Sequence, residues 1–175
     1  MTDWQFCFLS DSYYKDFPDQ NIMDNKEEVD GKIAYRPCFF AFRDTSCGDI
    51  IWLVPISSQY EKYKAIYDKN IQKYGRCPFI RFGEVLNKKA AFLIQNICPV
   101  TEKYIQEIYV DKNNVPIKID NRVVQDVISN ARATLSKVER GAKLIFPDIA
   151  SIKKVLLEDL KQPSKSELIP DHISP

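Results

Sequence analysis

The order of hydrophobic and polar positions predicts a chain that begins with strands and ends with helices. Residues 45–48 end in glycine between two hydrophobic runs, which indicates a hairpin. Runs rich in aromatic and β-branched residues predict the strands themselves, which span residues 4–10, 33–44, 49–57, 77–83 and 89–100. The first part of the chain is therefore expected to form a sheet.

Short helices are predicted between these strands. A helix at residues 11–17 is expected to lead into a polar, acidic loop at residues 19–32. From Ser58 onward, hydrophobic and tyrosine residues recur at three- and four-residue spacing, so we expect a helix that ends at Gly75. Residues 101–109 predict one further short helix.

The last third of the chain has a helical pattern. Asp120 or Asn121 can cap a helix that ends at Gly141, and the hydrophobic residues of this segment form a single stripe. A further helix is expected at about residues 148–161. Residues 162–175 contain three prolines and few hydrophobic residues, so we expect a loose tail.

Strands followed by a block of helices indicate the α+β class. We expect a compact, twisted antiparallel sheet with helices packed around it and a helical C-terminal third. Strands and helices do not alternate as in a doubly wound sheet, and no glycine-rich nucleotide-binding motif occurs. The length of 175 residues favours one domain, which we place at residues 1–161.

Composition narrows the environment of the protein. No run of about 18 hydrophobic residues occurs, so no membrane span is expected. The N-terminal segment carries Asp3 and lacks a basic flank, which argues against a secretion signal. The five cysteines are scattered and form no Cys-x-x-Cys pair. They argue against a disulfide framework or a zinc site and favour a reducing cytoplasm.

The net charge of +1 hides an uneven distribution. Residues 1–31 hold eight acidic and two basic residues, whereas residues 60–90 hold eight basic and three acidic residues. Basic residues interleaved with aromatic ones suit a polyanion whose bases can stack. A solvated helix face whose tyrosines pack inward would give the same pattern. The RNA-binding candidates in this stretch are Tyr60, Lys64, Lys73, Arg76, Arg81, Lys88 and Lys89.

Few side chains are available for catalysis. The only histidine is His172, in the expected tail, so serine–histidine and cysteine–histidine nucleophile systems lack their base. No acidic pair has metal-ligand spacing on one predicted element, so we expect neither a metal nor another cofactor. Chemistry on a phosphate would then depend on Ser, Thr, Tyr, Lys or Arg.

Ser57 and Ser58 stand where a predicted strand gives way to a helix with basic residues. A helix N-terminus presents free N–H groups and the positive end of the helix dipole, which together bind anions. Ser58 and Glu61 also match a capping box, in which the serine only caps the helix. The two roles are compatible, and the sequence leaves both open.

Several segments of the chain resemble one protein family. They are FCFLSDSYYKDF (6–17), RPCFFAF (36–42) leading to IIWLVPISSQYEKYK (50–64), and KYGRCPFIRFGEVLNKKAAFLIQNICPVTEKYI (73–105). Their common core is a strand that ends in Pro-hydrophobic-(Ser/Thr)-Ser, about twenty residues after a basic residue that opens the preceding strand. In these features the chain resembles the ToxN/AbiQ family of type III toxin–antitoxin endoribonucleases, and most closely its CptN branch.

The resemblance implies a fold, an activity and partners. The fold would be a MazF/Kid-like barrel surrounded by helices. The activity would be metal-independent cleavage of cellular or phage RNA that leaves a cyclic phosphate and a 5′-hydroxyl. The inhibitor would be a repeat-derived RNA pseudoknot, which the toxin cuts from its own precursor and with which it closes into a ring-like protein–RNA assembly.

The resemblance also implies a catalytic set. The family's (Ser/Thr)-Ser pair falls on Ser57 and Ser58, and its strand-opening basic residue falls on Arg36. Tyr35 corresponds to the family's upstream tyrosine. Ser58 and the helix start are expected to hydrogen-bond the phosphate, while Arg36 neutralises developing charge.

One position departs from the family pattern. The family lysine two positions after the second serine is Tyr60 in this chain, so Lys62 or Lys64 would supply that charge, and we place Lys62 in the catalytic set. Without histidine, proton transfer would depend on a tyrosine or a lysine.

Two other functions stay open at this point. One is a non-catalytic RNA-binding module that uses residues 60–90. The other is a Kid-like ribonuclease toxin held by a protein antitoxin.

Overall fold

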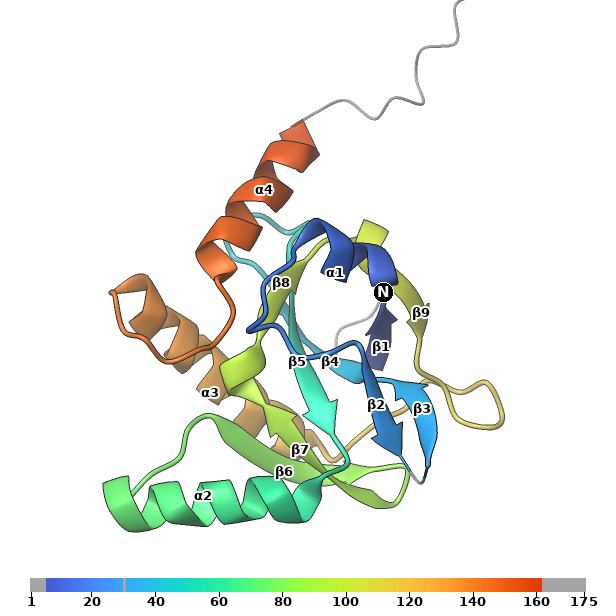
Figure 1. The fold of residues 1–175 in the computed structure, drawn as a ribbon, viewed down its shortest axis with the longest axis vertical. Helices are drawn as coiled ribbons and strands as arrows, with labels where there is room; N and C mark the ends of the chain where they lie inside the picture. The colour runs from blue at the N-terminus through green and yellow to red at the C-terminus, as the bar shows by residue number, and fades with distance from the viewer. Residues whose placement is uncertain (1–5, 30, 162–175) are drawn as a thin grey trace, which may run out of the picture.

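One antiparallel sheet runs through the middle of the molecule (Figure 1). The computed structural model describes residues 6–29 and 31–161. Within this part of the chain the strands follow the order β6-β7-β5-β4-β1-β9, with β8 beside β5. The seven strands of this sheet are β1 (Phe6–Leu9), β4 (Pro37–Arg43), β5 (Ile51–Ser57), β6 (Ile80–Val85), β7 (Lys88–Leu93), β8 (Cys98–Val100) and β9 (Ile105–Ile108). The predicted α+β class with an antiparallel sheet is confirmed, and the path of the sheet is open between β6 and β9.

Strand β5 lies at the centre of the sheet. All of its residues are buried, as its continuous hydrophobic run predicts. Strand β4 pairs with one edge of β5. The other edge is shared, because β8 pairs with residues 51–53 and β7 pairs with residues 56 and 57. The predicted strand at 89–100 is therefore two strands, separated by a 3₁₀ turn at Ile94–Asn96.

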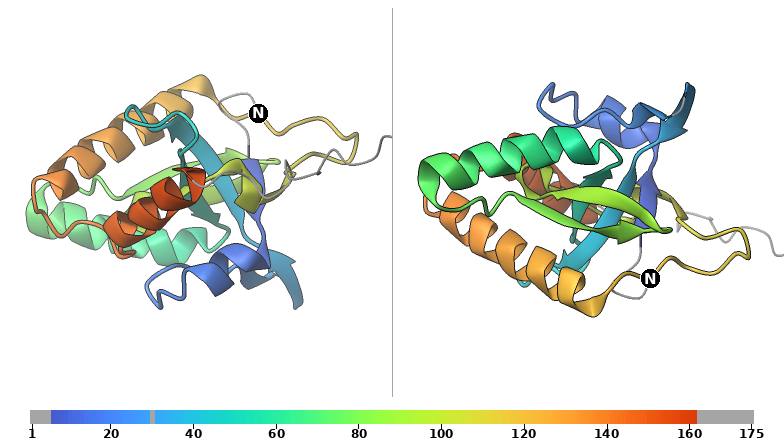
Figure 2. Two further views of the ribbon diagram at one scale, coloured as in Figure 1. Left: turned by 90° about the horizontal axis from the view of Figure 1, so that it is seen from above. Right: turned by 90° about the horizontal axis from the view of Figure 1, so that it is seen from below.

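Four helices surround the sheet in the described residues: α1 (Asp11–Asp16), α2 (Tyr60–Tyr74), α3 (Asn121–Glu139) and α4 (Ile149–Lys161). Helices α2 and α3 lie on opposite sides of the β6–β7 hairpin (Figure 2). The Asp120 carboxylate caps α3 by accepting a hydrogen bond from the Arg122 N–H at 2.7 Å. The predicted helical C-terminal part is confirmed up to residue 161, and the expected tail with His172 lies outside the described residues.

The hydrophobic core has three parts. The largest lies between the sheet and the hydrophobic stripe of α3, which buries Val124, Val127 and Leu135 as predicted. A second cluster joins α1, the other face of the sheet and α4. A third, smaller cluster packs Tyr63 of α2 against β6 and β7. The ends of β5 and the start of α2 are thereby held on a packed scaffold.

The prediction of a loop at residues 19–32 was wrong for its second half. A separate two-stranded sheet forms there from β2 (Lys26–Val29) and β3 (Lys32–Tyr35). The predicted strand at 33–44 is accordingly broken at Arg36, between β3 and β4. The missed signal is the Asp30-Gly31 pair, which is typical of two-residue hairpin turns, and Gly31 has a positive φ of 75°.

The predicted helix at 101–109 was also wrong. Only Glu102–Tyr104 forms a 3₁₀ turn, and Ile105–Ile108 forms β9, which pairs with β1. The free edge of β1 offers backbone hydrogen bonds to this segment, and that tertiary pairing overrides a weak local helix preference.

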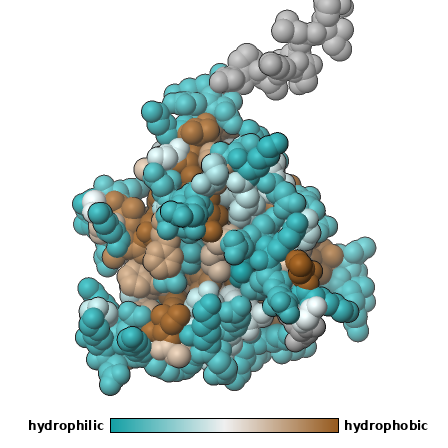
Figure 3. All heavy atoms as spheres, viewed as in Figure 1, coloured by the Kyte–Doolittle hydropathy of each residue, from teal (hydrophilic) through white to brown (hydrophobic). Residues whose placement is uncertain are grey.

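On the face in Figure 3, hydrophobic residues gather over the left half, between α4, α3 and α2. A smaller patch lies over the β2–β3 hairpin, where Ile33 is 78% exposed. No helix in the part of the chain that the structure describes is long and hydrophobic enough to cross a membrane.

Candidate functional site at the β5–α2 junction

The Ser57-Ser58 pair lies between two hairpins, β2–β3 and β6–β7 (Figure 1). Ser57 is the last residue of β5, and α2 begins at Tyr60. The strand is fixed by pairing on both edges, and Gly75 ends the helix in a left-handed conformation, as predicted. The short connection between them is therefore held at both ends by regular structure.

Ser57 is buried, and its hydroxyl is engaged within the protein. Its Oγ accepts a hydrogen bond from the Gln59 N–H at 3.2 Å. The same hydroxyl donates to Glu27 Oε2 over 3.5 Å. Ser57 therefore satisfies a backbone donor at the helix start and contacts a carboxylate from β2.

Ser58 differs from its neighbour. It is exposed, and its hydroxyl makes no hydrogen bond among the described residues. The capping box predicted from Ser58 and Glu61 does not form, because Gln59 occupies the N-cap position and gives no side-chain cap. The Ser58 hydroxyl is thus available to a ligand.

Arg36 immediately precedes β4 and is buried in an ion pair. Its Nη1 lies 2.7 Å from Glu27 Oε2, and the two side chains are 8% and 9% exposed. The guanidinium also donates to the carbonyls of Asp24, at 2.9 Å, and Ile56, at 3.3 Å. Arg36 therefore ties the β2–β3 hairpin to the end of β5, and much of its charge is balanced inside the protein.

Two cavities flank the junction. The larger, of about 720 Å³, is lined by Ser57, Arg36 and Lys62 together with Glu27. The smaller, of about 200 Å³, is lined by the two remaining predicted catalytic residues, Ser58 and Tyr35. Its other polar lining residues are Lys88, Lys89, Tyr109 and Glu27. The structure thus brings the five predicted catalytic residues to one junction but divides them between two cavities.

Lysines lie over aromatic rings at two places near the junction. Lys89 Nζ lies 5.1 Å from the centre of the Tyr60 ring, which itself packs edge-on against Phe82 at 5.0 Å. Lys26 Nζ lies 4.7 Å from the Tyr35 ring centre. Hydrogen bonds to the Tyr35 hydroxyl and the Asp11 carboxylate raise the pKa of Lys26, which keeps it protonated. This arrangement presents cations and stacking faces side by side.

The RNA-binding candidates divide by position. Tyr60, Lys88 and Lys89 lie at the junction, whereas Lys73 and Arg76 lie at the far end of α2, about 22 Å away for a helix of this length. Lys64 pairs with Asp68 along the same helix.

Arg81 has a different environment from the other candidates. Its guanidinium donates to the Cys77 and Ile80 carbonyls and contacts Asp126 and Asn130 on α3. These contacts join β6 to α3, so Arg81 has a structural role here.

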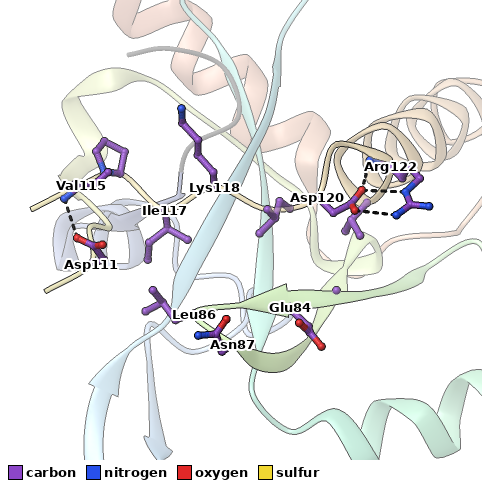
Figure 4. Close-up of a pocket in the computed structure, with 13 residues that line it drawn as sticks. Glu84, Leu86, Asn87, Asp111, Val115, Ile117, Lys118, Asp120 and Arg122 are labelled. Atoms are coloured by element: carbon purple, nitrogen blue, oxygen red, sulfur yellow. Dashed lines mark hydrogen bonds and ion pairs between the residues drawn. The ribbon is translucent and has the colours of Figure 1, made fainter. Parts of the chain in front are cut away.

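A third cavity, of about 730 Å³, lies away from the serines, between the β6–β7 turn and the start of α3 (Figure 4). Leu86 and Asn87 face Ile117 and Lys118 across it, and the Arg122 guanidinium is paired with Asp120 at 3.1 Å. Its lining holds three acidic and two basic residues, so it offers a polyanion less attraction than the junction does.

Metal and thiol chemistry find little support at the junction. Among the described residues, no three His, Cys, Asp or Glu side chains are grouped closely enough to hold a metal ion. All five cysteines are free thiols. Cys7 and Cys98 lie in the core, where burial raises their pKa to about 12 and keeps them protonated.

No protein-family model matches this chain, and no curated protein matches it significantly. The function must therefore be inferred from the junction itself.

One residue of this site, Glu27, was not predicted from the sequence. It falls in the predicted loop at residues 19–32, whereas the structure places it opposite Ala34 in the β2–β3 hairpin. Its carboxylate contacts both Ser57 and Arg36 and lines both cavities.

Proposed function

We propose that this protein is a metal-independent endoribonuclease and the toxin of a type III toxin–antitoxin system, of the ToxN/AbiQ family. The observation that carries the proposal is the Ser58 hydroxyl, which is exposed, makes no hydrogen bond within the described part of the chain, and lines a cavity with Lys88, Lys89 and Tyr35. A hydroxyl donor that shares a cavity with two cations, near the start of a helix, suits the oxygens of a phosphodiester.

The proposed reaction uses the RNA's own 2′-hydroxyl. Attack of O2′ on the neighbouring phosphorus builds negative charge on the phosphorane oxygens, and breakage of the P–O5′ bond leaves a cyclic phosphate and a 5′-hydroxyl. Ser58 and the two lysines would stabilise that charge, and Tyr35 and Tyr60 would offer faces for neighbouring bases. Arg36 would act indirectly, since its guanidinium is buried against Glu27.

The finer features of the family belong to the same proposal. The twisted antiparallel sheet with surrounding helices is compatible with a MazF/Kid-like core. The antitoxin would be a repeat-derived RNA pseudoknot that occupies the junction, and protein and RNA would close into a ring. Basic residues on α2 and on the β6–β7 hairpin would extend the RNA contact beyond the cleavage site.

Cleavage can be tested with purified protein and a mixed-sequence RNA in the presence of a chelator. We expect products with cyclic phosphate ends. Ser58→Ala should lower the cleavage rate by about a hundredfold or more, as loss of one transition-state donor does. It should leave the midpoint of unfolding unchanged, because the Ser58 hydroxyl is exposed and makes no hydrogen bond among the described residues. Ser136→Ala, at an exposed serine on α3, is the matched control and should cleave normally.

Two results would contradict the proposal. Salt-dependent RNA binding without any cleavage product would identify a non-catalytic RNA-binding module. Full cleavage activity of Ser58→Ala would show that the active site does not depend on Ser58. Co-expression separates the two kinds of antitoxin: DNA from upstream of the gene, transcribed without a reading frame, should relieve growth arrest if the inhibitor is RNA.

A further inference from the structure

Glu27 is the one carboxylate that lines both cavities of the junction. It reaches this place from the β2–β3 hairpin, which is separate from the main sheet. Ser58 lines only the smaller cavity, and Ser57 lines only the larger one. A group bound at Ser58 would therefore share the smaller cavity with one carboxylate, that of Glu27.

The contacts of Glu27 use one of its two carboxylate oxygens. Oε2 accepts hydrogen bonds from Arg36 Nη1, at 2.7 Å, and from the Ser57 hydroxyl, at 3.5 Å. Oε1 has no hydrogen bond among the described residues, and it is not a fully buried atom. One oxygen is thus fixed and the other is free to accept a proton.

Arg36 orients this carboxylate and places a positive charge 2.7 Å from it. A buried carboxylate without a partner would hold a proton and could not act as a base. The guanidinium supplies the opposite charge, and its bonds to the Asp24 and Ile56 carbonyls fix its position. A buried ion pair of this kind seldom increases stability over a hydrophobic pair, so its presence beside an exposed serine favours a functional role.

Histidine is absent from the described residues, so within them the candidate acceptor for the proton of the 2′-hydroxyl is another group. Tyrosine and lysine can do so only after losing their own proton. Burial raises the pKa of Tyr63, which makes its ionisation harder still. An ionised carboxylate needs no such step.

We infer that Glu27 is the general base of the site and that Arg36 and Ser57 are the positioning residues that hold it. The inference rests on the proposed ribonuclease function. Glu27 Oε1 takes the proton from the 2′-hydroxyl while the O2′–P bond forms. As the P–O5′ bond breaks, the departing 5′-oxygen takes a proton from the ammonium group of Lys88 or Lys89. That lysine recovers its proton from water, and Glu27 releases its proton to water.

Several charged and titratable groups share the two cavities with Glu27. They come from its own strand, the preceding loop, β3, α2, the β6–β7 hairpin and the segment after β9, and they are Asp24, Lys26, Glu28, Tyr35, Arg36, Lys62, Tyr63, Lys88, Lys89 and Tyr109.

The test compares pH–rate profiles of RNA cleavage by the full-length chain. In the wild type, the rate should fall in acid as the base takes up its proton. Glu27→Gln should cleave about a hundred- to ten-thousandfold more slowly, and the acid decline should disappear from its profile. Glu107→Gln, at an exposed glutamate carried by β9, is the matched control and should keep the wild-type rate and profile.

A second variant separates chemistry from folding. Glu27→Gln alone leaves Arg36 buried without its partner, which destabilises the protein. Combining it with Arg36→Gln removes both charges, so the double variant should recover most of the stability lost by Glu27→Gln. It should stay as slow as the single variant, because the base is still missing.

The outcomes are distinct. If the wild type cleaves RNA and Glu27→Gln keeps either its rate or its acid decline, the base assignment is wrong while the ribonuclease proposal stands. If the double variant regains both stability and cleavage, Glu27 was needed only for folding, and the assignment is again wrong. If the wild type does not cleave RNA at all, both proposals fail together.

Discussion

Ser57 and Ser58 are adjacent in the sequence and face different surroundings. Ser57 is the last residue of β5, which is buried on both faces, and the chain leaves the sheet before Ser58. The end of the strand therefore provides one buried hydroxyl, at Ser57, and one exposed hydroxyl, at Ser58. The first fits a structural role and the second fits contact with a ligand.

This difference predicts unequal effects of two substitutions on stability. Ser57→Ala leaves the Gln59 N–H without its acceptor and should lower the free energy of unfolding by about 1 kcal/mol. Ser58→Ala should change it by less than about 0.5 kcal/mol. Urea unfolding of the two variants measures both values. A larger loss for Ser58→Ala would mean that Ser58 supports the fold.

Gly83 is a second position where the size of one side chain affects packing, because there is no room for a Cβ atom. A Cβ added to Gly83 of β6 would lie 2.8 Å from Val123 Cγ1 and 3.1 Å from Phe92 Cε2. Valine has little rotational freedom, so α3 would have to move away from the sheet. Gly83→Ala should therefore destabilise the protein by about 1–3 kcal/mol, measured by thermal unfolding. Gly48→Ala, where a Cβ meets nothing within 4 Å, is the control.

At the scale of elements, α4 is held against the sheet by a carboxylate. Asp44, after β4, accepts hydrogen bonds from Lys153 of α4 at 2.7 Å and from the Trp52 indole at 2.9 Å. Burial alone would raise the pKa of Asp44, but the hydrogen bonds from Lys153, Ser46 and Trp52 outweigh it and lower the pKa well below its ordinary value. The ionised form is therefore stabilised by folding.

The sign of this shift predicts a pH dependence. A pKa lowered in the folded state contributes stability above the unfolded pKa, about 3.9, and loses that contribution as the pH falls toward the folded value. Asp44→Asn should cost about 1–3 kcal/mol at pH 7. The difference in free energy of unfolding between wild type and Asp44→Asn should become smaller below about pH 4. Chemical unfolding at pH 7 and below about pH 4 measures this difference, and a difference that stays constant would contradict the prediction.

At the scale of the whole molecule, the basic residues do not contribute equally to an RNA contact. Lys88 and Lys89 lie at the junction, whereas Lys64 is paired with Asp68. Replacing both Lys88 and Lys89 by alanine should weaken single-stranded RNA binding and reduce the slope of log affinity against log salt by about 1.4, or about 0.7 for each lost phosphate contact. Lys64→Ala should change the slope less. Equal slopes for both variants would exclude the junction as the RNA path.

The parts of the fold that the sequence predicts are those with strong local signals. The all-hydrophobic run of β5, the stripe of α3 and the glycine after α2 each determine their element without help from distant residues. The position of β9 could not be predicted in this way, because it depends on the free edge of β1, about a hundred residues earlier. Its local composition favours no single structure.

The features of the candidate site likewise divide into those that the local sequence predicts and those that depend on tertiary pairing. Ser57 and Ser58 were predicted from their place at a strand end and Arg36 from the family resemblance, and the structure brings them to one junction. The split of the serines between two cavities, and the meeting of Lys89 with Tyr60, depend on the register of β7 against β5. Sequence periodicity does not determine that register.

The shared edge of β5 has a consequence for the order in which the protein is completed during translation. Residues 1–57 already contain β1, β4 and β5, but β7 and β8 must be synthesised before the second edge of β5 is paired. β9 must follow before β1 is covered, and α4 packs against β8 later still. The serine junction therefore leaves the ribosome well before the sheet that holds it can form. A nascent chain shorter than about 110 residues should lack an assembled junction, so any activity of the site must await the second half of the chain.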